Sequence, residues 1–372
     1  MFCLCKLKGG QAIAQVITKT QEMTSLERVT TICQFKEPDR VPTFPLFLGA
    51  MHRFAGISFD EWSRCTNTEA MVQAHLDAFR LIGHDALVTA TDLSVEAGDL
   101  GQEVIYPTYD TAHPNYDNPF IRDTREDYRK LPKVNPRKSW EDEGHCRYDC
   151  RLVERGREDT CDRGIYYGTI GVLSMMREPE RFFQDLVEYP DEVMAAVEFL
   201  DEIFIDYVKA QLEAGAHGIC YDNLYGSQTI LGKDMWEKFE GNSVKKIMGV
   251  VADAGALVAF HNCGNSPYFD STEKFGKPHA FSHAYVADDV DRWEEHKAKW
   301  GHKIATIGWV PPGPVCMLGT HEEIEEECKA EIEIFAKGGG FILASGCEYP
   351  LNAPLYNSKL MIDSAKKYGI YK

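Results

Sequence analysis

The chain has 372 residues, with 58 acidic side chains against 40 Lys and Arg, for a formal net charge of −18. Because attraction to phosphates dominates nucleic-acid affinity, a chain this acidic is a poor general binder of nucleic acids. Hydrophobic residues make up 44% of the sequence, which argues against disorder and supplies a large core. Length alone is compatible with two domains, although α/β barrels of this size often form one.

Eight short apolar runs predict strands, and they recur along the chain between helical patterns. Most of them are continuously apolar, as expected for parallel strands that are covered on both faces. The runs span residues 41–46, 86–91, 165–170, 217–222, 257–261, 280–285, 304–309 and 341–345.

Helices are predicted between these runs from apolar residues at helical spacing. One long pattern is broken at Tyr189-Pro190, and another is entered through Thr320, a residue type that commonly caps a helix. One helix is predicted within residues 59–82, and the others span residues 180–214 (as two helices), 233–252, 292–300, 322–336 and 358–368.

This alternation predicts an α/β fold, a single (β/α)₈ TIM barrel with a long polar excursion after the second strand, between residues 93 and 163. Residues 1–25 are predicted to form an arm and residues 26–372 the barrel. Active sites of such barrels lie at the carboxyl ends of the strands. The residues to inspect are therefore Asp92, Asp222, Asn223, His261, Cys263, His283, Trp309, Cys347 and Glu348.

Twelve cysteines are many for this length. The first residues lack the apolar core of a signal peptide, and no apolar run approaches the roughly 18 residues that span a bilayer. We therefore expect a cytoplasmic protein with no membrane partner and with reduced thiols, most of them filling the core.

The sharpest local feature is His261 and Cys263, two residues apart at the end of a predicted strand. Alternate side chains of a strand share a face, so an imidazole and a thiol would project together. Cys347 ends the last predicted strand, and one imidazole with two thiolates is a common Zn²⁺ ligand set that leaves a fourth position open. The plainer alternative is a buried core histidine beside a buried cysteine. Glu240 could be a fourth ligand, and a rival cluster is His145, Cys146 and Cys150.

The same residues carry a family resemblance. The chain resembles the uroporphyrinogen decarboxylase superfamily and, within it, the corrinoid-dependent methyltransferases of the methylcobamide:coenzyme M type. The motifs that resemble the family are Glu27-Arg28-Val29, Glu37-Pro38-Asp39-Arg40-Val41-Pro42, Tyr189-Pro190-Asp191-Glu192-Val193, Ala214-Gly215-Ala216-His217-Gly218, His261-Asn262-Cys263-Gly264-Asn265 and Gly346-Cys347-Glu348.

The resemblance implies methyl transfer between a cobamide, presented by a partner corrinoid protein, and a small substrate. His261, Cys263 and Cys347 fit activation of a thiol by zinc. Asp222 and Glu348 are candidate catalytic residues that would orient ligands. Asp92 resembles the decarboxylase aspartate by position.

Two enzymatic alternatives stay open. An O-demethylase acting on a methoxylated donor would suit an aromatic pocket, which Met175, Tyr221, Tyr225 and Trp309 could provide. Uroporphyrinogen decarboxylase is disfavoured because the stretch 47–53 has one arginine, Arg53, where an octacarboxylate needs several cations. A third alternative is a non-catalytic protein that binds a tetrapyrrole.

Overall fold

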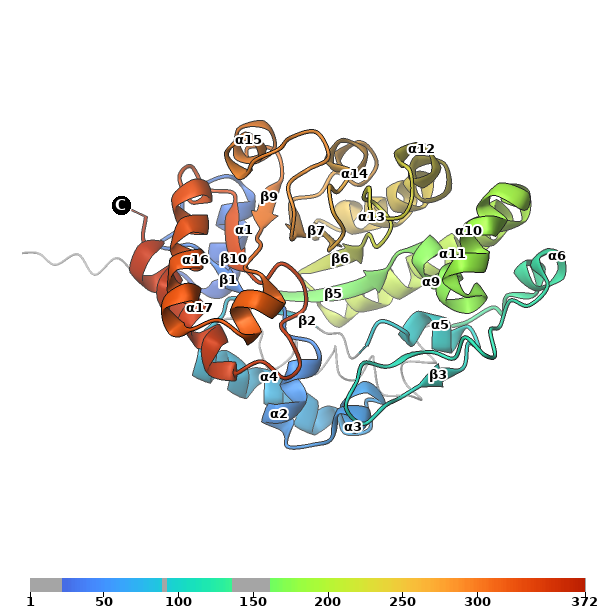
Figure 1. Ribbon diagram of the computed structural model, residues 1–372, viewed down its shortest axis with the longest axis horizontal. Helices are drawn as coiled ribbons and strands as arrows, with labels where there is room; N and C mark the ends of the chain where they lie inside the picture. Colours follow the sequence, from blue (N-terminus) through green and yellow to red (C-terminus); the bar gives the residue numbers. More distant parts are fainter. Residues whose placement is uncertain (1–21, 89–91, 136–160, 372) are drawn as a thin grey trace, which may run out of the picture.

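The computed structural model describes residues 22–88, 92–135 and 161–371. Eight of its strands form one curled parallel sheet with the order β1-β10-β9-β8-β7-β6-β5-β2, surrounded by helices (Figure 1). The predicted α/β fold is confirmed, and the curled sheet is similar to that of a TIM barrel. The strands are β1 Thr43–Phe44, β2 Ala86–Val88, β5 Cys161–Tyr167, β6 Gly218–Asp222, β7 Leu257–Asn262, β8 Ala280–His283, β9 Ala305–Ile307 and β10 Phe341–Ala344.

Each of the eight predicted apolar runs overlaps one of these strands, because continuous burial on both faces is what the runs indicated. The run 165–170 was placed too far along the chain. β5 ends at Tyr167, and Gly168 then caps a helix that begins at Thr169. The Glu240 carboxylate accepts a hydrogen bond from the Ile170 backbone N–H and so stabilises this early helix start.

The described helices surround the sheet, and α1 lies at one end of it. They are α1 Ser25–Cys33, α2 His52–Ala55, α3 Phe59–Ser63, α4 Thr68–Ile82, α5 Val95–Asp99, α6 Thr124–Asp127, α9 Thr169–Arg177, α10 Pro179–Glu188, α11 Pro190–Ala214, α12 Lys233–Trp236, α13 Asn242–Asp253, α14 Phe269–Gly276, α15 Trp293–Lys299, α16 His321–Phe335 and α17 Leu355–Tyr368. Shorter 3₁₀ and π segments are η1 Gly49–Met51, η2 Tyr128–Lys130, η3 Glu237–Gly241 and η4 Pro312–Met317.

Local chemistry explains several helix boundaries. Thr320 caps α16 in a reciprocal pair with Glu323, as its residue type predicted. Pro190 is the first residue of α11, where its missing N–H costs nothing. The helix predicted within residues 59–82 is confirmed as α4, which is capped by Asn67, and the short helix α3 precedes it. The predicted helix 233–252 is α12 and α13 joined by η3, a π-helical turn.

The excursion after β2 is described over residues 92–135. It contains α5, a hairpin of β3 (Val104–Ile105) and β4 (His113–Pro114), α6 and η2. The rival cluster His145, Cys146 and Cys150 and the greater part of the predicted arm, residues 1–21, lie outside the described residues. The arm boundary therefore stays a prediction.

An ion-pair network joins β1 and β2 at their amino-terminal ends. The Asp85 carboxylate accepts hydrogen bonds from Arg28 (2.6 Å), from Arg40 (2.7 Å) and from the Thr43 backbone N–H (2.8 Å). The Asp85 backbone N–H in turn donates to the Thr43 carbonyl at 2.8 Å. The family-like motifs at 27–29 and 37–42 thus supply the two arginines that connect the first and last strands of the sheet order.

The inside of the curled sheet is filled with apolar side chains from several strands, which form one cluster with side chains of α1. Val29 and Ile32 of α1 belong to this cluster, and α1 contacts β2, β5 and β10. Helix α1 covers the sheet at the amino-terminal ends of the strands. The carboxyl ends of the strands therefore remain available for a site. Among the described residues, no helix combines the length and apolar character needed to cross a membrane.

Candidate metal centre

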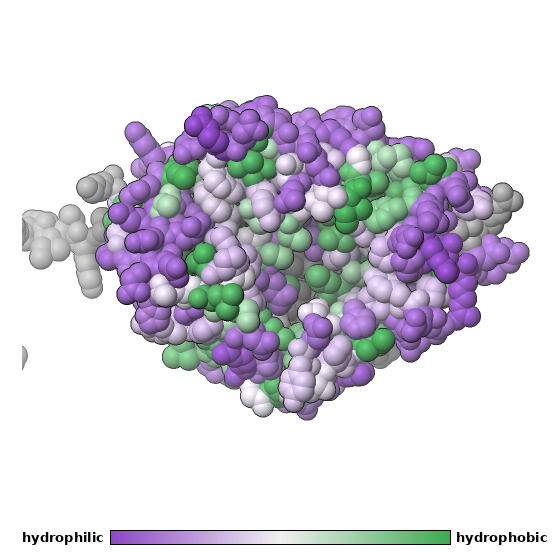
Figure 2. Space-filling model, viewed as in Figure 1, coloured by the Kyte–Doolittle hydropathy of each residue, from purple (hydrophilic) through white to green (hydrophobic). Residues whose placement is uncertain are grey.

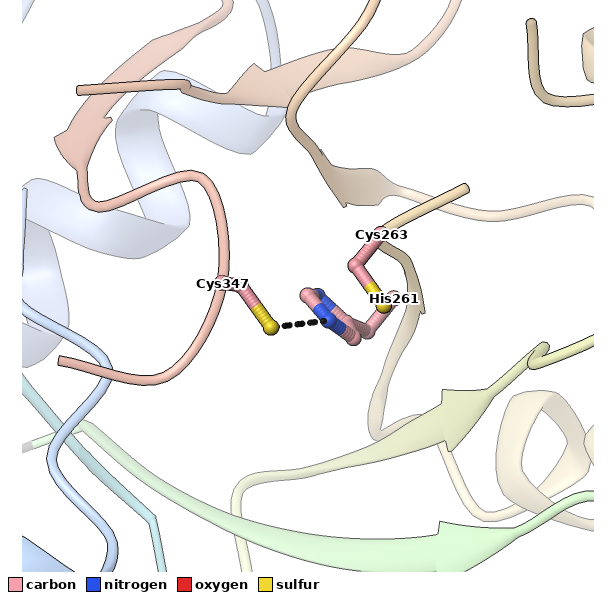
Figure 3. Close-up of side chains that lie close together, drawn as sticks. All are labelled: His261, Cys263 and Cys347. Carbon is pink, nitrogen blue, oxygen red and sulfur yellow. Dashed lines mark hydrogen bonds between the residues drawn. The ribbon is translucent and has the colours of Figure 1, made fainter. Parts of the chain in front are cut away.

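His261, Cys263 and Cys347 come together, as the sequence predicted. One ligand atom from each lies within 4.8 Å of the others. His261 is near the end of β7, Cys263 follows it, and Cys347 lies three residues after β10, so two separate strand ends supply the group (Figure 3). The Cys347 Sγ atom is 3.7 Å from His261 Nε2.

The imidazole of His261 is oriented by a neighbour that the sequence did not reveal. Its Nδ1 atom is 3.0 Å from the Ser282 hydroxyl on β8, the strand paired with β7 in this register. Nδ1 is thereby occupied, and Nε2 faces the thiol of Cys347. A hydrogen bond of this kind at the second ring nitrogen is the usual support for a metal-binding histidine.

The segment after β7 turns sharply to expose Cys263. The Asn262 side chain accepts a hydrogen bond from the Gly264 N–H at 2.9 Å. A Cβ atom on Gly264 would lie only 2.2 Å from the Ser227 hydroxyl oxygen, so this close approach requires glycine. The motif 261–265 therefore fixes both the direction and the exposure of its cysteine.

The segment that carries Cys347 is held on both sides. The Gly346 N–H donates to the Val310 carbonyl at 3.0 Å, and the Glu348 carboxylate accepts from the Gly49 N–H at 2.9 Å. Because backbone groups anchor the residues on either side, the Cys347 thiol is positioned by the rigid end of the sheet.

The two thiols are hydrogen-bonded to each other, so their ionisation is coupled. Hydrogen bonds from Cys347 and His261 hold the pKa of the Cys263 thiol well below its usual range. The hydrogen bond to Cys263 and burial raise the pKa of Cys347. The thiolate is the form that binds metals, so Cys263 is prepared to be a ligand.

The donor set fits Zn²⁺. Zinc ligand distances of about 2.3 Å to sulfur and 2.0–2.1 Å to nitrogen give tetrahedral S···N separations of about 3.6 Å. The 3.7 Å between Cys347 and His261 agrees with this value. Three side chains that converge with no fourth among the described residues match the composition of a catalytic zinc site.

The three residues line a small cavity of about 90 Å³. The viewed face of the molecule is hollowed near its centre, where apolar and polar side chains meet (Figure 2). The remaining side chains that line the cavity are Phe44, Leu46, Leu48, Val88, Leu93, Cys220, Asp222, Leu224, Ser282 and Glu348.

Two of the three predicted catalytic acids therefore line the cavity. Asp222, at the end of β6, is aligned with His261 across the strand pair, and burial raises its pKa to about 7. Burial also raises the pKa of Glu348. Cys220 was not predicted, although it shares a strand face with Asp222 two residues later.

Other predicted residues lie elsewhere. Asp92 is not among the described side chains that line the cavity. Burial raises the pKa of Asp92 to about 6. The Ser94 N–H donates a hydrogen bond to its carboxylate at 2.6 Å. Glu240 is outside the ligand group and binds Tyr221 and the start of α9.

The predicted strand-end residues His283 and Trp309 pack outward. His283 contacts Phe269 and His296, and Trp309 stacks on Trp293 with ring centroids 3.6 Å apart. Among the described residues that line this cavity there is neither Trp309 nor Met175, Tyr221 or Tyr225, so a role of these four side chains in a substrate pocket stays a prediction.

The sequence model of the uroporphyrinogen decarboxylase (URO-D) family matches residues 24–368, so this chain belongs to that family. The curated relatives include a methylcobamide:CoM methyltransferase MtbA of Methanosarcina mazei, 26% identical over 51% of this chain and 53% of that protein. The methylcobamide:CoM methyltransferase MtaA of Methanosarcina barkeri is 23% identical over 54% of this chain and 56% of that protein. The chain thus spans about half the length of the curated relatives it matches.

Solved structures support the fold. A methyltransferase from Methanosarcina mazei superimposes with a TM-score of 0.77 at 20% identity, over 93% of this chain and 99% of that one. A B12-independent methionine synthase from Shewanella sp. W3-18-1 gives a TM-score of 0.51 at 11% identity, over 81% of this chain and 87% of that one.

Proposed function

We propose that this protein is a zinc-dependent methyltransferase that moves a methyl group between the cobamide of a partner corrinoid protein and a small thiol. The observation that carries the proposal is the convergence of His261, Cys263 and Cys347 within 4.8 Å beside a cavity. The names of the methylcobamide:CoM methyltransferase relatives support the reaction class.

Each residue of the site has a distinct role in this proposal. His261, Cys263 and Cys347 would hold Zn²⁺, which lowers the pKa of a thiol bound beside it. Ser282 orients His261 through its Nδ1 atom. Asp222 lines the same cavity and is the candidate acceptor of the thiol proton, while Glu348 binds the Gly49 N–H and keeps the Cys347 segment in place.

The reaction balances in the direction of thiol methylation. The S–H bond breaks and its proton leaves to the carboxylate or to water. The S–C bond forms as the Co–C bond breaks, and the electron pair of that bond stays on cobalt. The cavity, at about 90 Å³, holds the thiol and not the much larger cobamide, so the corrinoid must be presented from outside.

The same cavity argues against the two other enzymatic alternatives. Its described lining has no arginine or lysine to bind the carboxylates of a porphyrinogen. It has one aromatic side chain, Phe44, where a methoxyaromatic donor would favour several. Both features favour a small thiol.

Metal content and methyl transfer test the proposal together. Protein purified without chelator should contain about one zinc per chain and should demethylate methylcobalamin in the presence of a thiol. His261→Ala, Cys263→Ala and Cys347→Ala should each lower zinc content and transfer, whereas Cys33→Ala, at a buried cysteine outside the site, should retain both. Full zinc content in a variant that lacks all three ligands would refute the site.

Two broader predictions belong with this proposal. The connection of β1 and β2 through Asp85 and Thr43 supports closure of the sheet as a full eight-stranded (β/α)₈ barrel. The cytoplasmic location expected from the sequence agrees with a reaction that needs reduced thiol ligands.

A further inference from the structure

We infer that Cys263 and Cys347 form a redox switch, in which oxidation by a peroxide joins the two thiols in a disulfide and releases the zinc. The inference rests on the zinc site of the proposed function and adds a mode of regulation to it. It comes from the distance between the two thiols, from their unequal exposure and from the position of a third cysteine in the cavity wall, Cys220.

The two thiols are close enough to react with each other. Their Sγ atoms lie within 4.8 Å and share a hydrogen bond, and both side chains point toward His261 (Figure 3). A disulfide has a sulfur–sulfur distance of about 2.05 Å, so the two sulfur atoms need to approach by less than about 3 Å. The Cys347 segment is anchored by the Val310 carbonyl and the Gly49 N–H, whereas Cys263 lies in an exposed segment after β7. We therefore expect Cys263 to make most of this movement.

Exposure makes Cys263 the preferred target of an oxidant. Among the cysteines whose side chains the structure describes, Cys263 alone is exposed and Cys347 is partly buried. The others are buried, namely Cys33, Cys65, Cys220, Cys316 and Cys328. Because oxidation of a thiol depends on access to it, a peroxide should react with Cys263 first.

Two steps convert the thiols to a disulfide. The Cys263 sulfur attacks one oxygen of hydrogen peroxide, the O–O bond breaks, and the products are a sulfenic acid (S–OH) and water. The Cys347 sulfur then attacks the Cys263 sulfur, the S–O bond breaks, and a second water leaves. The two sulfur atoms are oxidised and the peroxide is reduced. When the thiolates start as zinc ligands, the two protons come from solvent.

The disulfide removes two of the three metal ligands. Zinc is bound by thiolates, and the sulfur atoms of a disulfide no longer carry that charge. His261 alone remains, and a single imidazole does not retain zinc against a chelator. Reduction of the disulfide by a dithiol regenerates both thiols, so the switch is reversible.

Cys220 is the rival partner for an oxidised Cys263, because it lines the same cavity. On β6, however, Cys220 is paired with Ala259, two residues before His261. Cys220 is therefore about 7 Å further from the carboxyl end of the sheet than His261. The Cys347 sulfur, at 3.7 Å from His261 Nε2, is at the level of the imidazole. The geometry thus favours Cys347 as the thiol that completes the disulfide.

Oxidation of the zinc-loaded protein tests the inference without a measurement of activity. We would titrate hydrogen peroxide, follow zinc release with a chromophoric chelator, and identify cross-linked peptides by mass spectrometry. We expect one Cys263–Cys347 disulfide for each zinc released, and recovery of zinc binding after treatment with dithiothreitol. Zinc release without this cross-link, or with Cys220 in its place, would overturn the inference. So would retention of both thiols and of zinc at peroxide concentrations that oxidise free cysteine.

Two serine variants test the order of the steps. Cys347→Ser lacks the second thiol, so the sulfenic acid on Cys263 should persist and react with dimedone. Cys263→Ser retains the partly buried thiol, and Cys347 should take up at least tenfold less dimedone. Buried Cys33 should stay unlabelled in both variants, which shows that they are folded. Equal labelling of Cys263 and Cys347 would contradict the order, and loss of the cross-link in Cys220→Ser would assign the second step to Cys220.

The outcomes separate the switch from the proposed function. If the purified protein contains no zinc and transfers no methyl group but still forms the Cys263–Cys347 disulfide, the redox pair stands and the proposed function fails. If the protein binds zinc and transfers methyl groups but peroxide forms no such disulfide, the proposed function stands and the switch is wrong.

Discussion

At the scale of single residues, the site depends on a side chain outside the family-like motif. Ser282 occupies Nδ1 of His261 and leaves Nε2 directed toward Cys347. The orientation of the imidazole is therefore a property of the β7–β8 pairing as well as of the motif itself.

Ser282→Ala should weaken zinc binding without unfolding the protein. Loss of a supporting hydrogen bond to a metal-binding histidine typically costs 10–100-fold in metal affinity. Competition with a chromophoric chelator would measure this change. Ser174→Ala removes a buried hydroxyl that bonds the Gly171 carbonyl, far from the ligands in sequence, and should keep the native affinity. Equal affinities in the two variants would show that Ser282 does not support the metal.

At the scale of elements, the connection between β1 and β2 depends on one carboxylate. Asp85 is fully buried and binds two arginines that come from α1 and from the segment before β1. Three parts of the chain that are separated in sequence are joined at this group. Removing its charge leaves two guanidinium groups without their shared partner.

Asp85→Asn should lower the free energy of unfolding by about 3–5 kcal/mol, the typical cost of breaking a buried ion pair from one side. Asp77→Asn is the matched control, because Asp77 pairs with Arg80 at 3.2 Å on the exposed surface, and it should change stability by less than about 1 kcal/mol. Urea denaturation followed by circular dichroism would compare them. Similar losses in the two variants would mean that the network is not what stabilises this connection.

The sequence could predict the elements because burial on both faces produces long apolar runs. It could predict His261 and Cys263 as neighbours because alternate residues share a strand face. The positions of Ser282 and Cys220 in the cavity wall could not be predicted. A strand that is apolar on both faces does not show which of its faces lines a cavity. Boundaries such as Gly168 were missed because a distant carboxylate, Glu240, stabilises the following helix.

At the scale of the whole molecule, the metal centre connects parts of the sheet that are not neighbours. β8 and β9 lie between β7, which carries His261, and β10, which precedes Cys347. A metal bound by all three ligands would hold these two strand ends together across the cavity. Metal binding and global stability should consequently be linked.

Saturating zinc should therefore raise the thermal midpoint of unfolding. A ligand at 100 times its dissociation constant stabilises the folded state by about 2.7 kcal/mol, which corresponds to several degrees for a chain of this size. Cys347→Ser leaves His261 and Cys263, which both come from the end of one strand, and zinc should raise its midpoint much less. Magnesium, which prefers oxygen ligands, should have little effect on either protein. If zinc stabilised Cys347→Ser as strongly as the native chain, the metal would be held at one strand end alone and would not connect β7 with β10.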